Sequence, residues 1–206
     1  MNVLIVAKTR MGSSYLCVGG IDLEENRSLR LLQSNGSNQP ANTRLNIGEI
    51  WDIDYVPKKE VEPPHVEDVV VNRCKFMRTQ IYLKNFILER IEPWMGSPDN
   101  LFDGMLCGTE TGKGYVCKEA GIPKRSTGFW LSDLGLVRGD FREKVQYRYP
   151  AVNPIIYLPY TGCDPPADDL PEGTLLRVSL ARWWSPPGAL DQDKKCYLQL
   201  SGWYLE

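Results

Sequence analysis

Residues 174–204, TLLRVSLARWWSPPGALDQDKKCYLQLSGWY, contain two runs in which apolar and polar side chains alternate. In the first run every second residue from Leu176 to Leu180 points to one side, and in the second run the same holds from Cys196 to Leu200. Because successive strand side chains leave opposite faces of a sheet, both runs predict half-buried strands. The segment between them is rich in proline, glycine and charge, which is typical of an exposed hairpin tip. We therefore expect a long C-terminal β-hairpin against which the second half of the chain closes.

Length and charge limit the classes of function. The chain has 206 residues, of which 42% are hydrophobic, and its formal net charge is -2. This length allows one large domain or two small ones, and the charge argues against a protein that coats duplex DNA through a uniform positive field. Basic residues outnumber acidic ones eight to four between positions 113 and 148, whereas acidic residues lead seven to four from position 151 onward. An anionic partner is therefore expected at the middle of the chain.

The cysteines and the N-terminus bear on metal binding and localisation. The six cysteines are widely spaced and His65 is the lone histidine, so neither a zinc site nor another cofactor is expected. The apolar run at residues 3–7 is too short for a signal peptide, and no run approaches the roughly 20 residues that cross a bilayer. We expect a cytoplasmic protein with no membrane contact, whose reduced thiols pack mostly as small buried apolar groups.

Short strand-like runs dominate the chain and predict a mainly β fold. In the first half they are residues 2–8, 15–22, 28–32, 49–56 and 67–71. Beyond position 110 they are residues 115–118, 127–131, 144–149 and 155–160, followed by the terminal hairpin. Residues 79–91 instead repeat apolar side chains at intervals of two to four, which predicts an amphipathic helix. This spacing favours two small OB-like or Greek-key barrels with one short helix rather than a parallel sheet.

The domain boundary is expected near residues 94–104, where glycine and proline are frequent. We predict a first OB-like domain at residues 1–95 and a second at residues 96–206, which includes the C-terminal hairpin. Exchange of strands between the two barrels is left open.

Several phrases of the sequence resemble one family. They are SLRLL at 28–32, NIGEIWDIDY at 46–55, PPHVEDVVV at 63–71, LRVSLARWW at 176–184 and KKCYLQLSGWY at 194–204. In this order, after an N-terminal strand, they resemble the prokaryotic dual OB-containing domain family, and the likeness spans nearly the whole chain. The resemblance implies two OB-like barrels and nucleic-acid recognition in a bacterial conflict or phage-defence setting. It implies no catalytic residue.

Basic and aromatic residues in the second half supply the means to bind single strands. Such binders combine cations that track the phosphates with aromatic faces on which bases stack, each stack contributing about 1–3 kcal/mol. The candidate nucleic-acid-binding residues are Lys124, Arg125, Trp130, Arg138, Arg142, Tyr147, Arg148, Arg182, Trp183 and Arg10. Neighbouring rings on a strand point to opposite faces, so at least one of Phe129 and Trp130 is expected in the core. Trp183 and Trp184 are expected to divide in the same way, one exposed and one packed inward.

Two other motifs are weaker. The loop GTETGKG at residues 108–114 departs from a phosphate-binding loop in its glycine spacing and in the missing hydroxyl, so a glycine loop bordering a groove is the better interpretation. His65, Glu67 and Asp68 gather an imidazole and two carboxylates, but neighbouring residues of a strand point to opposite faces. We expect them to form a capped strand entry with solvated acids rather than to hold a metal.

These observations leave three hypotheses in order of preference. The first is a protein without enzymatic activity or cofactor that recognises nucleic acid, RNA or single-stranded DNA rather than duplex. The second is an adaptor whose barrels bind other proteins of a defence complex. The third is a metal-dependent, nuclease-like enzyme that uses Glu67 and Asp68.

Overall fold

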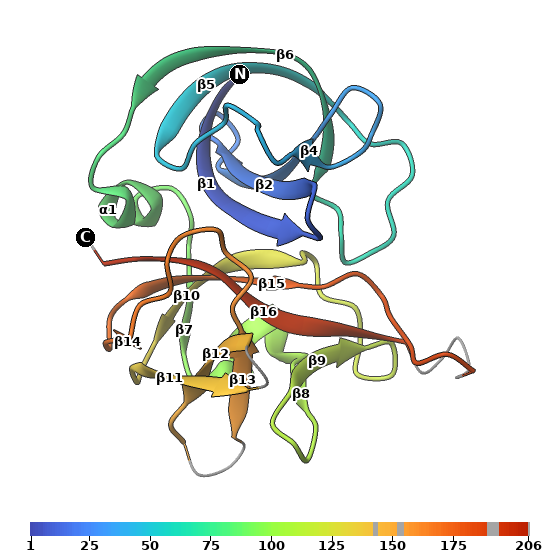
Figure 1. Ribbon diagram of the computed structural model, residues 1–206, viewed down its shortest axis with the longest axis vertical. Coiled ribbons are helices and arrows are strands. Elements are labelled where there is room, and N and C mark those ends of the chain that lie inside the picture. The colour runs from blue at the N-terminus through green and yellow to red at the C-terminus, as the bar shows by residue number, and fades with distance from the viewer. Residues whose placement is uncertain (142–143, 152–154, 189–193, 206) are drawn as a thin grey trace. The chain divides into compact units, whose positions relative to one another are not determined.

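The computed structural model describes residues 1–141, 144–151, 155–188 and 194–205 and confirms the prediction of a mainly β fold (Figure 1). The chain forms two compact units. Unit 1 comprises Met1–Glu92 with Tyr204–Glu206, and unit 2 comprises Pro93–Trp203. No helix in the described part of the chain is long and apolar enough to cross a membrane.

Unit 1 is a closed β-barrel. Its strands are β1 (Asn2–Met11), β2 (Tyr15–Asp22), β3 (Arg27–Leu32), β4 (Gln39–Pro40), β5 (Glu49–Pro57) and β6 (Asp68–Thr79). Strands β1, β5, β6, β3 and β2 pair in this order, and β2 pairs back to β1. The β3–β6 pairing is parallel, whereas the other pairings of the barrel are antiparallel. This closed barrel confirms the expectation of an OB-like module.

A bulge bends the barrel where the sequence places two adjacent glycines. The β1–β2 register shifts between Ile5 and Ala7, opposite Gly19 and Gly20. A Cβ on Gly20 would lie 2.6 Å from Cγ1 of Val3, so a larger residue would push the two strands apart. Glycine therefore allows the close approach that the bend requires.

The end of unit 1 corrects two predictions. Strand β6 continues to Thr79, well beyond the predicted end at residue 71, because its second half pairs with β5 as far as Glu49. Helix α1 spans only Leu83–Leu88, so the helix predicted over residues 79–91 was too long. Tyr82, just before the helix, takes a left-handed conformation with φ 56°, which cannot continue a right-handed helix.

Unit 2 contains two sheets. Its elements are β7 (Trp94–Gly96), the 3-10 helix η1 (Pro98–Gly104), β8 (Cys107–Gly108), β9 (Gly114–Cys117), β10 (Thr127–Ser132), β11 (Leu136–Phe141), β12 (Lys144–Tyr149), β13 (Ile156–Pro159), β14 (Asp169–Leu170), β15 (Leu175–Leu180) and β16 (Lys195–Tyr204). The larger sheet has the order β7-β10-β15-β16-β9-β8, and the smaller has the order β13-β12-β11-β14. The larger sheet is curled into a half-barrel (Figure 1). It is consistent with the second OB-like domain that the sequence predicts.

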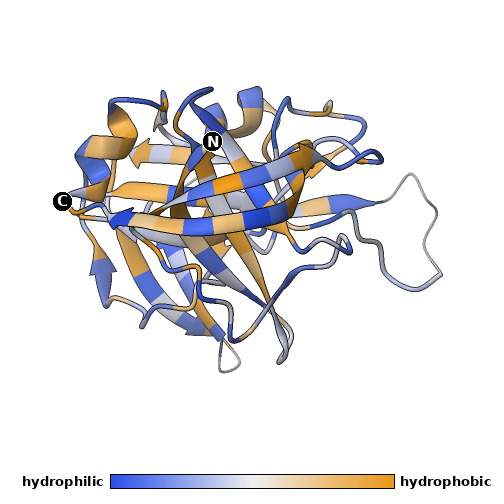
Figure 2. Cartoon of the chain, turned by 90° about the horizontal axis from the view of Figure 1, so that it is seen from above, coloured by the Kyte–Doolittle hydropathy of each residue, from blue (hydrophilic) through white to orange (hydrophobic). Residues whose placement is uncertain are grey.

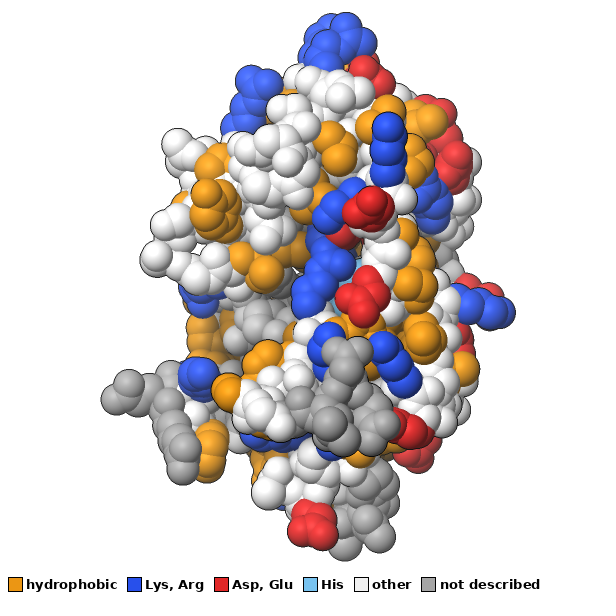
Figure 3. Space-filling view, turned by 90° about the vertical axis from the view of Figure 1, so that its right-hand side faces the viewer, with side chains coloured by type: hydrophobic (Ala, Val, Ile, Leu, Met, Phe, Trp, Pro, Cys, Tyr) orange, Lys and Arg blue, Asp and Glu red, His pale blue; other side chains and the backbone are white. Residues whose placement is uncertain are grey.

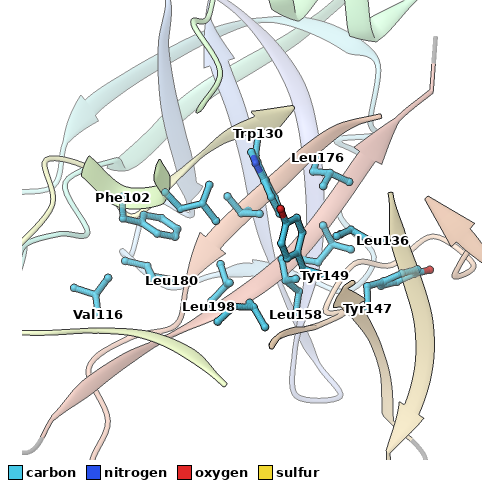
Figure 4. Packing of buried hydrophobic residues seen from close by; sticks show 14 of the residues in the cluster. Phe102, Val116, Trp130, Leu136, Tyr147, Tyr149, Leu158, Leu176, Leu180 and Leu198 are labelled. Atoms are coloured by element: carbon cyan, nitrogen blue, oxygen red, sulfur yellow. The ribbon is translucent and has the colours of Figure 1, made fainter. Parts of the chain in front are cut away.

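The C-terminal hairpin forms as predicted and supplies much of the core of unit 2. Strands β15 and β16 are neighbours in the larger sheet, and Cys196, Leu198 and Leu200 are buried. They pack in one cluster with aromatic side chains such as Trp130 (Figure 4), and hydrophobic and hydrophilic residues alternate along the strands (Figure 2). Arg177 departs from the predicted pattern, because it is buried and donates a hydrogen bond to Ser201 Oγ at 3.0 Å.

The cysteines are less buried than expected. All six lie in the described part of the chain as free thiols, and of these Cys196 alone is buried while the others are half-buried. Burial raises the pKa of the Cys107 thiol, and the neighbouring Cys117 raises it further. The expectation that most thiols behave as buried apolar groups was wrong, because four of them lie at partly exposed strand positions and Cys163 lies in a connection between strands.

Candidate nucleic-acid interface

Three aromatic rings form a row on unit 2. The Tyr115 and Tyr197 ring centroids are 6.2 Å apart, and those of Tyr197 and Trp184 are 6.1 Å apart. Their planes are inclined by 56° and 57° respectively. We call Tyr115, Tyr197 and Trp184 the aromatic strip.

Backbone pairing fixes the order of the aromatic strip. Strands β9 and β16 are antiparallel, with Tyr115 directly opposite Tyr197, and they lie side by side in Figure 1. The adjacent Val116 and Cys196 are both fully buried, so alternation turns the two tyrosines to the outer face. Trp184 is held beside β16 by two backbone hydrogen bonds with Lys195, of 3.0 and 2.8 Å.

Exposure makes Trp184 the ring best suited to stack on a base. It is 51% exposed, whereas Tyr115 and Tyr197 are half-buried. Centroid spacings near 6 Å are those of rings in mutual contact, so no base can enter between neighbours of the strip. A base would instead stack on the exposed face of Trp184.

One lysine ammonium group lies against the aromatic strip, and another lies against the neighbouring Trp183. Lys195 Nζ is 4.2 Å from the Tyr115 centroid, and Lys118 Nζ is 5.6 Å from the centroid of Trp183. Both distances suit cation–π attraction, which holds the positive charges beside the aromatic surface. Glu119 is nearby, and hydrogen bonds from its own backbone N–H and from the Cys117 thiol lower its pKa, as does the charge of Lys195. The strip thus combines ring faces with one cation, Lys195, whose charge is partly offset by the Glu119 carboxylate.

Two of the predicted stacking residues belong to the core. Trp130 and Tyr147 are fully buried, and so is Phe129. The Trp130 indole N–H donates to the Gly96 carbonyl at 2.8 Å, and the Tyr147 hydroxyl donates to the Ala167 carbonyl at 2.6 Å. The predicted roles of Trp130 and Tyr147 as binding residues were wrong, because their rings face the inside of unit 2 and have no face open to a base.

The arginine side chains predicted to bind nucleic acid in the middle of the chain do not point toward one groove. Arg138 makes ion pairs of 3.3 Å with both Asp140 and Asp168. Arg148 is exposed, but it lies opposite Val137 in the smaller sheet. Since Val137 and Arg138 are adjacent on β11, Arg138 and Arg148 point to opposite faces of that sheet. Arg142 lies outside the described residues.

Two further predicted cations lie before β10. Lys124 is exposed, and its backbone N–H donates to Asp103 Oδ2 at 2.9 Å. The Arg125 guanidinium stacks 4.5 Å from the centroid of Trp94 and is half-buried. Of these two cations, Lys124 is therefore the more exposed.

The hairpin base carries predicted residues that do lie together. Trp183 is half-buried against the core, whereas its neighbour Trp184 is exposed, so the two indoles divide as the sequence predicts. Arg182 precedes them and is exposed, while Arg10 is an exposed residue of β1 in unit 1. Sequence reasoning missed Tyr115, Tyr197 and Lys195, although alternation around the buried Cys196 carried the signal for Tyr197.

Unit 1 offers a less accessible surface at the place where OB barrels usually bind. This place comprises strands β2 and β3 with the loops at residues 12–14 and 58–67. Here Arg30 Nη1 lies 3.1 Å from Asp68 Oδ1, and Lys58 Nζ lies 3.9 Å from Asp68 Oδ2. The side chain of Arg30 is only 11% exposed, so its charge is compensated within the barrel.

The acidic and histidine cluster of the sequence lies inside unit 1. His65, Glu67 and Asp68 are all buried, with exposed fractions of 0%, 4% and 2%, so the expectation of solvated acids was wrong. Within the described ranges, no three His, Cys, Asp or Glu side chains gather as a metal site requires. Asp68 instead serves as the acidic partner of Arg30 and Lys58.

A match to a protein-family model shows to which family this chain belongs. The model of the dual OB-containing domain matches residues 1–203. The chain belongs to this dual OB-containing domain family. The match confirms the resemblance in the sequence, and the barrel of unit 1 with the curled sheet of unit 2 is the architecture of this family member.

Other comparisons of this dual OB-containing domain give weaker likenesses. No curated protein matches it. Among solved structures, the Ifi202 HINa domain in complex with 20bp dsDNA has 9% identity, a TM-score of 0.38, and coverage of 98% of this chain and 95% of that chain. The p204 HINb domain has 10% identity, a TM-score of 0.36, and coverage of 97% and 95%. TM-scores this low support no inference about what this chain binds.

Charge on the surface of the dual OB-containing domain is mixed. On the face shown in Figure 3, Lys and Arg side chains are interspersed with Asp and Glu side chains. The coloured residues of that face form no continuous basic surface. On this face, binding of an anionic polymer would therefore depend on local features rather than on a broad positive field.

Proposed function

We propose that this protein recognises nucleic acid without catalysing a reaction, and that the aromatic strip of unit 2 is the contact surface. The exposed indole of Trp184, in a row with Tyr197 and Tyr115, is the observation that carries the proposal. A base stacks on Trp184, Lys195 beside the strip neutralises a phosphate, and the exposed Lys118, which lies against Trp183, neutralises another. Aromatic faces flanked by cations are the usual means of binding single strands.

The strip favours unpaired bases. A base inside a duplex is covered on both faces by its neighbours, so it cannot stack on Trp184 without leaving the helix. We therefore propose RNA or single-stranded DNA as the ligand. The family resemblance supports a bacterial conflict or phage-defence setting, with the protein acting in the cytoplasm.

Fluorescence anisotropy with labelled single-stranded RNA, single-stranded DNA and duplex DNA at two salt concentrations tests the proposal. The double substitution Trp184→Ala, Tyr197→Ala should weaken single-strand binding by about 1–3 kcal/mol per lost stack, or roughly 5- to 150-fold. A matched control is Tyr82→Ala, which removes an exposed ring from unit 1 outside the usual OB binding place and should leave the affinity unchanged.

Substitution of the two lysines should change the salt dependence of binding. Lys118→Ala with Lys195→Ala should weaken binding of all sequences alike and flatten the dependence of log K on log salt, by about one unit of slope for each lysine. Failure of the wild-type protein to bind any of the three ligands, or binding that the aromatic substitutions leave unchanged, would refute the proposal.

A further inference from the structure

Half of strand β6 in unit 1 has a sheet neighbour on one side only. It pairs with β5 from Val69 to Thr79, but with β3 only over residues 68–70. Among the described strands, none pairs with the second edge of β6 over residues 71–79. In Figure 1 this stretch runs along the top of unit 1 with no strand beyond it.

This edge is open to solvent and carries cations. Phe76 and Met77 are 47% and 50% exposed, and Arg73, Lys75 and Arg78 are exposed as well. An unpaired edge presents backbone N–H and C=O groups that can pair with another chain, and proteins commonly guard such edges with charge. The edge is therefore a template for an added strand whose charge must suit the cations.

Strand β5 shows which sequence complements β6. Asp54 lies opposite Arg73 and Asp52 opposite Lys75, whereas Trp51 lies opposite Phe76. Acid therefore meets base on one face of the β5–β6 pair, while apolar groups meet on the other. The Trp51 and Phe76 rings are in edge contact at 5.6 Å between centroids.

We propose that the free edge of β6 binds an extended segment of a protein partner, in which acidic and apolar residues alternate. The acidic residues would lie opposite Arg73 and Lys75, and the apolar residues would lie opposite Phe76, repeating the pairing that β5 makes. Main-chain hydrogen bonds along residues 71–79 supply affinity, and the alternating side chains supply specificity. This site is in unit 1 and is independent of the aromatic strip.

In the register centred on Cys74, charge argues against a second copy of this chain as the occupant. Two β6 edges paired antiparallel about Cys74 would place Arg73 of each copy opposite Lys75 of the other. Like charges directly opposite destabilise a sheet. The Arg44 guanidinium, which donates to the Cys74 carbonyl at 3.4 Å, adds a further positive charge beside this stretch. An acidic segment satisfies all of these cations.

A labelled peptide of alternating Asp and Ile, about as long as residues 71–79, tests the proposal by fluorescence anisotropy. It should bind the full chain, and a peptide with Lys in place of Asp should not. Arg73→Glu with Lys75→Glu should weaken binding of the Asp peptide roughly ten-fold or more and create binding of the Lys peptide. The matched control Lys59→Glu with Lys84→Glu changes the net charge equally and should leave Asp-peptide binding within about two-fold.

The backbone contribution is measured separately. Methylation of alternate peptide nitrogens removes donors along one edge and should abolish binding, and added peptide should slow amide hydrogen exchange in residues 71–79. If the charge reversal unfolds unit 1 by circular dichroism, Arg73→Gln with Lys75→Gln replaces it and should still weaken Asp-peptide binding.

Three results would overturn the inference. The first is peptide binding that is unchanged by both the charge reversal and the methylation. The second is absence of peptide binding by the wild-type protein. The third is displacement of the peptide by an oligonucleotide. The variant Trp184→Ala, Tyr197→Ala should bind the peptide as the wild type does, so failure of nucleic-acid binding and failure of strand docking are distinguished.

Discussion

Unit 2 contains two sets of aromatic residues with opposite environments. Trp130, Tyr147 and Tyr149 lie in the core, whereas Tyr115, Tyr197 and Trp184 lie on the outer face. The polar atoms of the buried rings form hydrogen bonds inside the fold. For example, the Tyr149 hydroxyl donates to Asp133 Oδ1 at 2.8 Å. The exposed rings instead touch one another, and Lys195 lies against the Tyr115 ring. The two sets consist of the same residue types, so the type of a residue does not reveal its role.

The difference arises from strand alternation combined with pairing. Tyr197 lies between the buried Cys196 and Leu198, which turns its ring outward. Trp130 lies opposite Leu176 of β15 and adjoins Trp94 of β7, so its position in the middle of a curled sheet turns its ring inward. The comparison predicts that the first set determines stability and the second determines binding.

The largest expected effect concerns the buried set. Trp130→Ala should lower the free energy of unfolding by about 3–5 kcal/mol, because it removes a fully buried indole and its hydrogen bond to Gly96. Urea denaturation followed by circular dichroism measures this change. A loss below about 1 kcal/mol would show that Trp130 is not a core residue and would remove the distinction between the sets.

A smaller effect should depend on pH. Burial and the hydrogen bond to Asp133 raise the pKa of Tyr149 to about 12. Since this pKa lies above the unfolded value, the stabilisation is complete below about pH 10 and is lost as the pH rises toward about 12. Tyr149→Phe should therefore cost about 1–2 kcal/mol near pH 8, with the difference from wild type shrinking above pH 10. Chemical denaturation at a series of pH values measures it, and a difference that stays constant across that range would contradict the assignment.

The smallest expected effect on stability belongs to the exposed set. Trp184→Ala should change the free energy of unfolding by no more than about 0.5 kcal/mol, because half of the indole surface already faces water. Tyr197→Ala should cost up to about 1 kcal/mol more, since it breaks a direct cross-strand pair with Tyr115. Thermal unfolding of both variants is the measurement. A loss from Trp184→Ala comparable to that of Trp130→Ala would place the strip among structural residues.

The sequence predicted what local alternation controls. It predicted the bounds of β2 and β12 as the structure has them. It also predicted that one of Trp183 and Trp184 is exposed and the other packs inward. It could not predict the full length of β6, because the charged end of this strand becomes a strand only by pairing with β5. The burial of Arg177 likewise depends on Ser201, which lies on the adjacent strand.

The candidate site was less predictable than the fold. A high density of basic and aromatic residues drew attention to the middle of the chain, but density does not report on which face each side chain lies. Arg138 forms an ion pair with Asp168, which lies thirty positions away in the sequence. Local sequence patterns cannot predict a pairing over this separation. The strip joins residues of β9 and β16 that lie far apart in the sequence, so only the register of the two strands brings Tyr115 to Tyr197.

A parallel titration of labelled single-stranded RNA and DNA tests the central claim most directly. It compares Trp184→Ala, Tyr197→Ala with Phe141→Ala, Arg148→Ala, which removes an exposed ring and an exposed cation from the smaller sheet of unit 2. We predict that the first variant loses roughly 5- to 150-fold in affinity for each lost stack, whereas the second loses no more than about two- to three-fold. Strong loss in the second variant with wild-type affinity in the first would contradict the account and return the binding site to the middle of the chain.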